Sequence, residues 1–200
     1  DRATSFEHVG AVGGRPFTVT HEPGEVESIV GASITPRSMR WLDAAPIAGR
    51  TLIPADSEPG AERVVVIRES LWTRRYSGDP DLIGRAITIG GVPRTVVGIL
   101  PDAFKFPNQG ELWLPLDELT LGGTLAEAMP ARGAFGVLKP GVTTEAANAQ
   151  ANTMSAQLRT PPPPDGVARL LIRPFTADSN ESNIAINALV FVLLMVLLVV

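Results

Sequence analysis

RVVVIRESLWTRRYSGDPDLIGRAITIGGVPRTVVGIL, residues 63–100, is the stretch that decides the fold. Its continuous apolar run at 63–67 predicts a β-strand. The next segment, Glu69–Tyr76, is predicted to be a helix, because Trp72 and Tyr76 are four residues apart and share one helical face. A strand therefore leads directly into a short helix.

The second half of this stretch predicts a β-hairpin. Two β-rich runs, 86–89 and 92–100, are joined by the glycines at 90–91, which can both adopt the positive φ of a type I′ turn. A two-residue turn places Thr88 opposite Pro93 in a pair without backbone hydrogen bonds. The missing N–H of this proline therefore costs the ladder nothing.

The segments before and after residues 63–100 are predicted to add further strands and helices. Residues 15–20 and 26–34 read as two strands around a Pro-Gly turn, followed by a short helix at 38–43. Residues 134–138 read as a strand and 144–158 as a helix. The helix carries an apolar stripe of mostly small residues at Ala147, Ala151, Met154 and Leu158.

The C-terminal part of the soluble region completes a strand–helix–strand unit. Four prolines at 161–164 form a stiff spacer, and residues 167–172 read as the returning strand. The segment from 134 to 172 is therefore predicted to be a βαβ unit or half of a ferredoxin-like fold.

Polar side chains near these elements have simple structural interpretations. Arg74 and Arg75 are interpreted as a solvated helix end that favours the C-terminal dipole, rather than as an anion site. Phe104, Phe106 and Trp113, set among prolines, are interpreted as packing aromatics under an irregular loop, rather than as a ligand box.

The composition excludes several classes of function. The 200 residues are 44% hydrophobic and carry a net charge of −4, so the chain has ample core and no basic surface for nucleic acid. The absence of cysteine excludes disulfides, thiolate metal sites and thiol nucleophiles. The two histidines, His8 and His21, are not paired at metal-ligand spacing, and the sequence contains no phosphate-loop, dinucleotide or nucleophile-elbow motif. We therefore expect no catalytic, cofactor or metal residues, and no enzyme.

The last 17 residues, IAINALVFVLLMVLLVV at 184–200, are predicted to be a transmembrane helix that the chain end truncates. As a helix they span about 26 Å, against a hydrocarbon core of about 30 Å. A buried core helix is the alternative, but no polar stripe follows Asn187. Sparse basic residues upstream favour a non-cytoplasmic domain. The residues predicted to lie in the membrane are Ile184, Ile186, Leu189, Val190, Phe191, Val192, Leu193, Leu194, Met195, Val196, Leu197, Leu198, Val199 and Val200.

Several stretches together resemble the MacB-like periplasmic core domain of ABC-transporter permeases, a group that includes permeases with an FtsX-type membrane part. The stretches that carry the resemblance are residues 30–52, 63–107, 111–116 and 136–158. One departure is Arg68, which stands where such sequences usually place a small capping residue before the Trp-containing helix. That helix should lose a cap worth about 1 kcal/mol unless another group supplies it.

The resemblance implies an α+β fold, made of a discontinuous βαβ, porter-like subdomain with an inserted β-rich subdomain. The start of a transmembrane helix would follow. The implied boundaries are 1–52 with 130–178 for the porter-like subdomain, 53–129 for the insertion, 179–183 for a juxtamembrane linker and 184–200 for the membrane helix.

The function that the resemblance implies is that of an extracytoplasmic, periplasmic domain of an ABC-type permease in the bacterial inner membrane. It would transmit ATP-driven motion of the membrane part to a substrate or partner. The implied partners are membrane lipid, a second permease copy, an ATP-binding subunit and a periplasmic adaptor or substrate. A tail-anchored extracytoplasmic binding or adhesion module is the alternative, since it would have the same apolar C-terminus.

Overall fold

A computed structural model describes residues 5–22, 24–107, 110–116, 133–158, 171–174 and 189–193. The chain forms two compact units, one made of residues 1–11 and 132–200 and the other of residues 12–131. Residues 12–52, which we expected in the porter-like subdomain, group with the second unit instead. The reason is that their strands pair with strands of the stretch that follows them.

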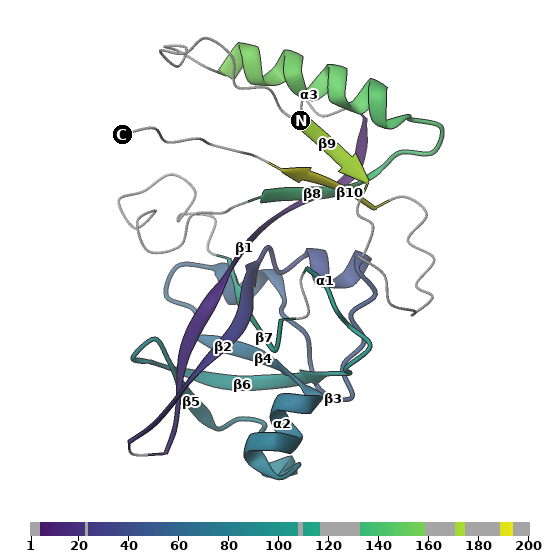
Figure 1. The fold of residues 1–200 in the computed structure, drawn as a ribbon. Helices are drawn as coiled ribbons and strands as arrows, with labels where there is room; N and C mark the ends of the chain where they lie inside the picture. Colours follow the sequence, from purple (N-terminus) through teal and green to yellow (C-terminus); the bar gives the residue numbers. More distant parts are fainter. Residues whose placement is uncertain are drawn as a thin grey trace. The chain divides into compact units, whose positions relative to one another are not determined.

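The second unit is built on a closed ring of six strands (Figure 1). Around the ring the order is β2–β7–β4–β6–β5–β1, and β1 pairs again with β2. The pairs β2–β7 and β4–β6 are parallel and the others antiparallel. Each of the six strands therefore has two neighbours, which removes the exposed edges that promote aggregation. The strands are β1 (Phe6–Glu22), β2 (Glu25–Ile34), β4 (Val64–Arg68), β5 (Ala86–Ile89), β6 (Val92–Leu100) and β7 (Leu112–Pro115).

Short elements complete this unit. The helices are α1 (Ser38–Trp41) and α2 (Glu69–Tyr76), the 3-10 turns are η1 (Pro54–Ser57) and η2 (Pro80–Leu82), and β3 (Ala48–Gly49) pairs with β6. The predicted helix at 38–43 is thus shorter than expected, and α2 has the predicted bounds. The strand β7 falls in a segment that we had interpreted as irregular.

The core of the second unit lies inside the strand ring. Alternate residues of β1 and β5 point inward, so the strands show the period-2 burial expected of a sheet with one covered face. All five residues of β4 are buried, in agreement with its continuous apolar sequence. The inward-facing core residues are Phe17, Val19, Ile29, Val65, Ile67, Leu71, Leu82, Ile87, Ile89, Val96, Ile99, Leu112 and Leu114.

The predicted glycine hairpin is confirmed. Thr88 lies opposite Pro93, and Gly90 and Gly91 have φ values of 59° and 75°. Close packing requires a second glycine at position 98. A Cβ built on Gly98 would lie 1.9 Å from the backbone carbonyl oxygen of Arg50.

Helix α2 begins without a cap from its own N-terminal residue, as expected from Arg68. The missing acceptor comes from the loop after β6, where Asp102 Oδ1 accepts the backbone N–H of Ser70 at 3.0 Å. The carboxylate of Glu69 accepts in turn from the Asp102 amide at 3.4 Å. A residue 32 positions away along the chain thus replaces the local cap.

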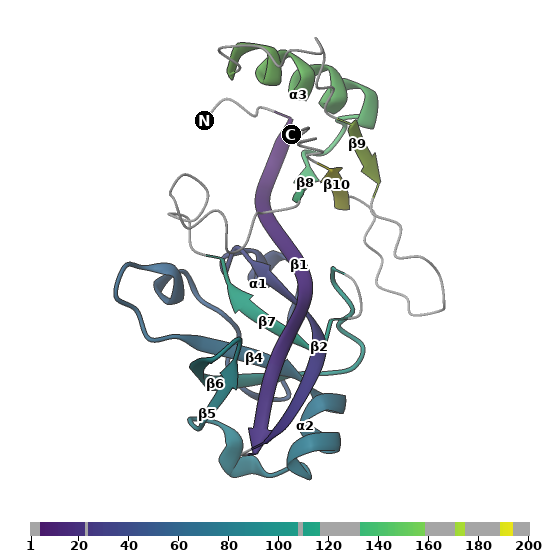
Figure 2. The same ribbon diagram turned by 60° about the vertical axis from the view of Figure 1, so that its left-hand side comes forward.

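In its described residues, the first unit has a small sheet and the helix α3. Its elements are the first residues of β1, then β8 (Gly133–Leu138), α3 (Thr144–Leu158), β9 (Leu171–Pro174) and β10 (Leu189–Leu193). Both views show α3 lying along one face of this sheet (Figures 1 and 2). Ala147 and Ala151 pack against Leu138, which confirms that part of the predicted stripe. The side chains of Met154 and Leu158, and the residues of the proline spacer, lie outside the described parts.

The sheet of the first unit is a split βαβ arrangement. Strand β10 pairs antiparallel with both β8 and β9, so β8 and β9 run parallel with one strand between them. The predicted order of elements, a strand, a helix and a second strand parallel to the first, is thus confirmed. The returning strand is described from Leu171 to Pro174, and residues 167–170 of the predicted strand lie outside the described parts.

The central strand of this sheet comes from the C-terminal apolar run. Leu189, Val190, Phe191, Val192 and Leu193 form strand β10 in this structure, where the sequence predicted part of a membrane helix. Valine and phenylalanine fit a pleated sheet well, and pairing with β8 and β9 satisfies the backbone on both sides. Among the described residues, the structure has no helix long and apolar enough to cross a membrane. The other predicted membrane residues, Ile184, Ile186 and those at 194–200, lie outside the described parts.

Candidate functional site

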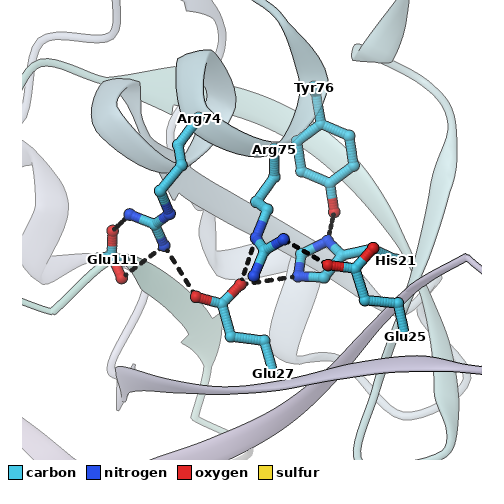
Figure 3. A network of polar contacts seen from close by, with 7 residues as sticks. All are labelled: His21, Glu25, Glu27, Arg74, Arg75, Tyr76 and Glu111. Atoms are coloured by element: carbon cyan, nitrogen blue, oxygen red, sulfur yellow. Dashed lines mark hydrogen bonds and ion pairs between the residues drawn. The ribbon is translucent and has the colours of Figure 1, made fainter.

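A cluster of polar side chains lies at the end of the strand ring near the β1–β2 turn. The inward rows of β1 and β2 change there from apolar to polar, from Val19 to His21 and from Ile29 to Glu27. Helix α2 lies over this end and brings Arg74 and Arg75 to the strands (Figure 3).

The two arginines bind three carboxylates from two different strand segments. Arg74 donates to both oxygens of Glu111, at 2.8 and 3.2 Å, and to Glu27 Oε1 at 3.1 Å. Arg75 donates through Nε to Glu27 Oε2 at 2.6 Å and through a second nitrogen to Glu25. We call these five residues the α2 clamp.

The α2 clamp corrects our interpretation of Arg74 and Arg75 as a solvated helix end. Strand β2 pairs with β7, and the amide of Glu111, the residue directly before β7, donates to the carbonyl of Val30 in β2. Partly exposed ion pairs each contribute only about 0–1 kcal/mol, so the network orients the helix more than it stabilises the fold. The hydrogen bond from Arg75, with the charges of both arginines, holds the pKa of Glu27 below its ordinary value.

A histidine connects the α2 clamp to the end of the helix. His21 Nε2 lies 3.1 Å from Glu27 Oε2, and His21 Nδ1 lies 3.0 Å from the hydroxyl of Tyr76. An ionised carboxylate can only accept, so with a neutral ring Nε2 carries the proton and Nδ1 accepts the tyrosine O–H. The histidine side chain is only 5% exposed.

Tyr76 is a hydrogen-bond donor in this arrangement, not an activated nucleophile. Burial is the main cause that raises its pKa to about 12, so the phenol keeps its proton at neutral pH. A nucleophilic phenol would need the opposite shift. The Tyr76–His21–Glu27 chain therefore serves to fix the helix end against the strands.

A hollow of about 310 Å³ adjoins this chain of hydrogen bonds. It is lined by Thr20, His21, Tyr76, Leu82, Arg85, Ala86, Ile87 and Thr88. At its rim Arg85 donates to Asp79 Oδ2 at 3.0 Å, and the other oxygen of Asp79 accepts the amide of Asp81 at 2.9 Å.

A second polar group is buried among the predicted packing aromatics. Arg68 donates to the carbonyl of Phe104 at 2.7 Å, and its guanidinium carbon lies 5.7 Å from the centre of the Trp113 ring. Trp113 donates in turn to the carbonyl of Phe106 at 2.8 Å. Burial lowers the pKa of Arg68 from its ordinary value. The aromatics are therefore packed structural residues, as the sequence indicated.

In the described parts of the chain, no group of three or more histidine, aspartate or glutamate side chains is placed to hold a metal ion. The sequence analysis considered His21 and excluded it as a metal ligand. It did not identify the carboxylates of the α2 clamp as functional residues. Their spacing two residues apart is the only local signal for Glu25 and Glu27, since their arginine partners are 47 to 50 positions away.

Comparison with solved structures shows where this fold recurs. The chain is similar to the periplasmic region of MacB from Actinobacillus actinomycetemcomitans, with a TM-score of 0.61, 14% identity and coverage of 78% of this chain and 68% of that one. It is also similar to the extracellular domain of the noncanonic ABC-type transporter YknZ from Gram-positive bacteria, with a TM-score of 0.58, 18% identity and coverage of 76% and 75%. A domain of a putative permease from Porphyromonas gingivalis gives 0.59, 18% identity and coverage of 80% and 73%.

Sequence comparison assigns the family. No match was found among curated protein sequences. The family profile of the MacB-like periplasmic core domain matches residues 2–154, more than half of the chain and all of the strand ring. This chain therefore belongs to the family of MacB-like periplasmic core domains.

Proposed function

We propose that this chain is the extracytoplasmic part of an ABC-type permease of the bacterial inner membrane, and that it passes ATP-driven motion of the membrane part to a substrate or partner outside. The observation that carries the proposal is the family match over residues 2–154. The proposed partners are an ATP-binding subunit, a second permease copy and a periplasmic adaptor or substrate.

The construction of the second unit supports a role in transmission. A domain that relays movement must move as one body, because slack elements would absorb the displacement. Each strand of the ring is paired on both sides, and the α2 clamp ties the helix to β2 and to the start of β7. Closed strand pairing, with ion pairs at the C-terminal end of α2, resists local deformation.

The attachment to the membrane is the second part of the proposal. We propose that residues 184–200 enter the bilayer as a helix in the intact permease, with residues 179–183 as the juxtamembrane linker. Thirteen of these 17 residues are Leu, Val, Ile or Phe, which favour insertion. In lipid, a helix would satisfy the hydrogen bonds of its own backbone, so it would not need β8 and β9 as partner strands.

The test uses the intact permease in membranes with an introduced cysteine. Because this chain has no cysteine, Thr73→Cys on the exposed side of α2 gives one labelling site in the domain. We expect ATP to change the spin-label distance between two permease copies. Six Gly/Ser residues inserted after Ser179 should abolish that change while ATP hydrolysis continues, because a slack linker cannot transmit displacement.

The matched control is the same insertion after Gly60, an exposed turn in the second unit with no atom within 4 Å of a Cβ built there. This control should leave the ATP response unchanged. An ATP response that survives the insertion after Ser179 would refute transmission through the linker. A label that never responds to ATP would favour a membrane-anchored binding module instead.

A further inference from the structure

The outer surface of the strand ring contains a flat area without charged side chains. Residues that alternate with the core residues of β1, β2 and β5 point away from the core there. The strand registers align them in three rows, one that crosses four strands and two that cross only β1 and β2. The residues of these rows, which we call the outer face, are Val26, Thr20, Thr88 and Pro93, then Ser28 with Thr18, and Val30 with Pro16.

The outer face is open to solvent in this structure. Val26 and Val30 are 61% and 51% exposed, the highest values among the large hydrophobic side chains that the structure describes. Figure 2 shows β1 at the front of the second unit, with no helix of that unit over it. The four hydroxyls of the outer face have no hydrogen-bond partner within the described parts of the chain. Contiguous exposed surface with apolar side chains typically marks an interaction site.

The chemistry of the outer face favours a second copy of this chain as its partner. A hydroxyl both donates and accepts hydrogen bonds, so threonine and serine can bond to threonine and serine. A twofold axis requires such a self-complementary surface, because the same residues face each other across it. The chain carries a net charge of −4, which opposes contact between two copies through their charged surfaces. An area without charge is therefore where two copies can meet without repulsion.

The size of the outer face limits the strength of this contact. One residue of a sheet surface covers about 33 Å², given a strand spacing of about 4.8 Å and a two-residue repeat of about 6.8 Å. The whole outer face therefore covers about 260 Å², roughly a third of the 800 Å² that each partner contributes to a stable interface. Two freely diffusing copies should pair only weakly. Two copies held in one membrane assembly meet at an effective concentration of about a millimolar, which allows the contact to form.

We propose that two copies of this chain pack their outer faces against each other across a twofold axis. The proposal rests on the proposed function, since the membrane part of the permease brings the two copies together. Sheets that pack face to face lie about 10 Å apart. Thr18 is in the middle row on β1, close to the centre of the outer face. It should therefore lie near the twofold axis and close to Thr18 of the second copy.

Disulfide trapping tests this contact, because the chain has no cysteine of its own. Thr18→Cys is introduced into the intact permease in membranes and oxidised with copper phenanthroline in the absence of ATP. The matched control is Thr73→Cys, the same substitution at an exposed position of α2 outside the outer face. We expect the disulfide-linked pair to form about tenfold faster with Thr18→Cys, because the proposed contact raises the local concentration of its thiols.

A charge variant tests whether the two outer faces touch. Ser28→Glu, added to Thr18→Cys, brings two carboxylates together across the contact and should lower the trapping rate to that of Thr73→Cys. Thr73→Glu adds the same charge on α2 and should leave the rate with Thr18→Cys unchanged. Circular dichroism checks that each variant is folded.

Three results would overturn the proposal. Equal trapping rates for Thr18→Cys and Thr73→Cys, or no trapping, would mean that the outer faces do not meet. Trapping that survives Ser28→Glu would exclude contact across this surface. A disulfide from Thr18→Cys to a different protein would assign the outer face to that protein.

The proposed function has a separate readout, the ATP response of the label at Thr73. An ATP response without trapping through Thr18→Cys refutes only the contact between outer faces. Trapping without an ATP response refutes only the transmission of motion.

Discussion

Tyr76 provides a direct test of how α2 is held on the strands, because it is the only tyrosine in the chain. Raising the pH is the perturbation. Burial raises the pKa of Tyr76 from 10.0 to about 12, against smaller opposing effects of Arg75 and Arg85. At pH 11 a group with a pKa of 10 is about nine-tenths ionised, whereas one with a pKa of 12 is about one-tenth ionised.

The assay is the phenolate absorbance in the near ultraviolet, measured for the folded chain and for the same chain unfolded in urea. At pH 11 the folded chain should show about one-tenth of the phenolate signal expected at full ionisation. Since the folded pKa is the higher one, the unfolded chain loses this proton first, and the free energy of unfolding should fall between pH 10 and pH 12. Circular dichroism at each pH confirms that the chain is still folded.

A variant separates the contribution of the histidine. His21→Ala removes the acceptor of the tyrosine O–H and opens space beside the ring, so the pKa of Tyr76 should move back toward 10. A folded wild-type chain that titrates near pH 10 would refute the burial of the ring and its hydrogen bond to His21.

Three further changes test the elements around this site. Asp102→Ala should lower the free energy of unfolding by about 1 kcal/mol, because it removes the remote cap of α2; a change near zero in urea titrations would contradict that role. Gly98→Ala should destabilise by about 2 kcal/mol or more, since the new Cβ would meet the carbonyl of Arg50, whereas an unchanged thermal midpoint would rule out this close approach. Wild-type stability should decrease as the pH falls below 4.5 and through the lowered pKa of folded Glu27, since the hydrogen bond from Arg75 lowers that pKa, and Glu27→Gln should show a smaller decrease in acid titrations.

The sequence alone determined the elements whose signals are local. The hairpin at residues 86–100 follows from two adjacent glycines that accept positive φ, and helix α2 follows from residues within one stretch of eight. The small residues Ala147 and Ala151 identified the packed face of α3. Conformational preferences act over a few residues, so these elements could be predicted without knowing what they pack against.

The site depends on contacts that no local pattern encodes. Arg74 and Glu111 are 37 positions apart, so the arginine pair looked like a solvated helix end until the fold brought its partners to it. Glu27 lay on the predicted strand 26–34, but the sequence did not indicate that a basic helix covers that part of the strand. The pocket beside Tyr76 likewise exists only because β1 leaves β5 after two pairs.

Tertiary structure alone also decided how ambiguous segments are used. Strand β7 was hidden among prolines and aromatics, and pairing with β2 and β4 makes it part of the ring. Leu189–Leu193 is apolar enough for a helix or a strand, and the free edges of β8 and β9 select the strand. The amino-acid composition determines which side chains avoid water. The segments that supply hydrogen bonds to the backbone determine whether those side chains are buried in a helix or in a strand.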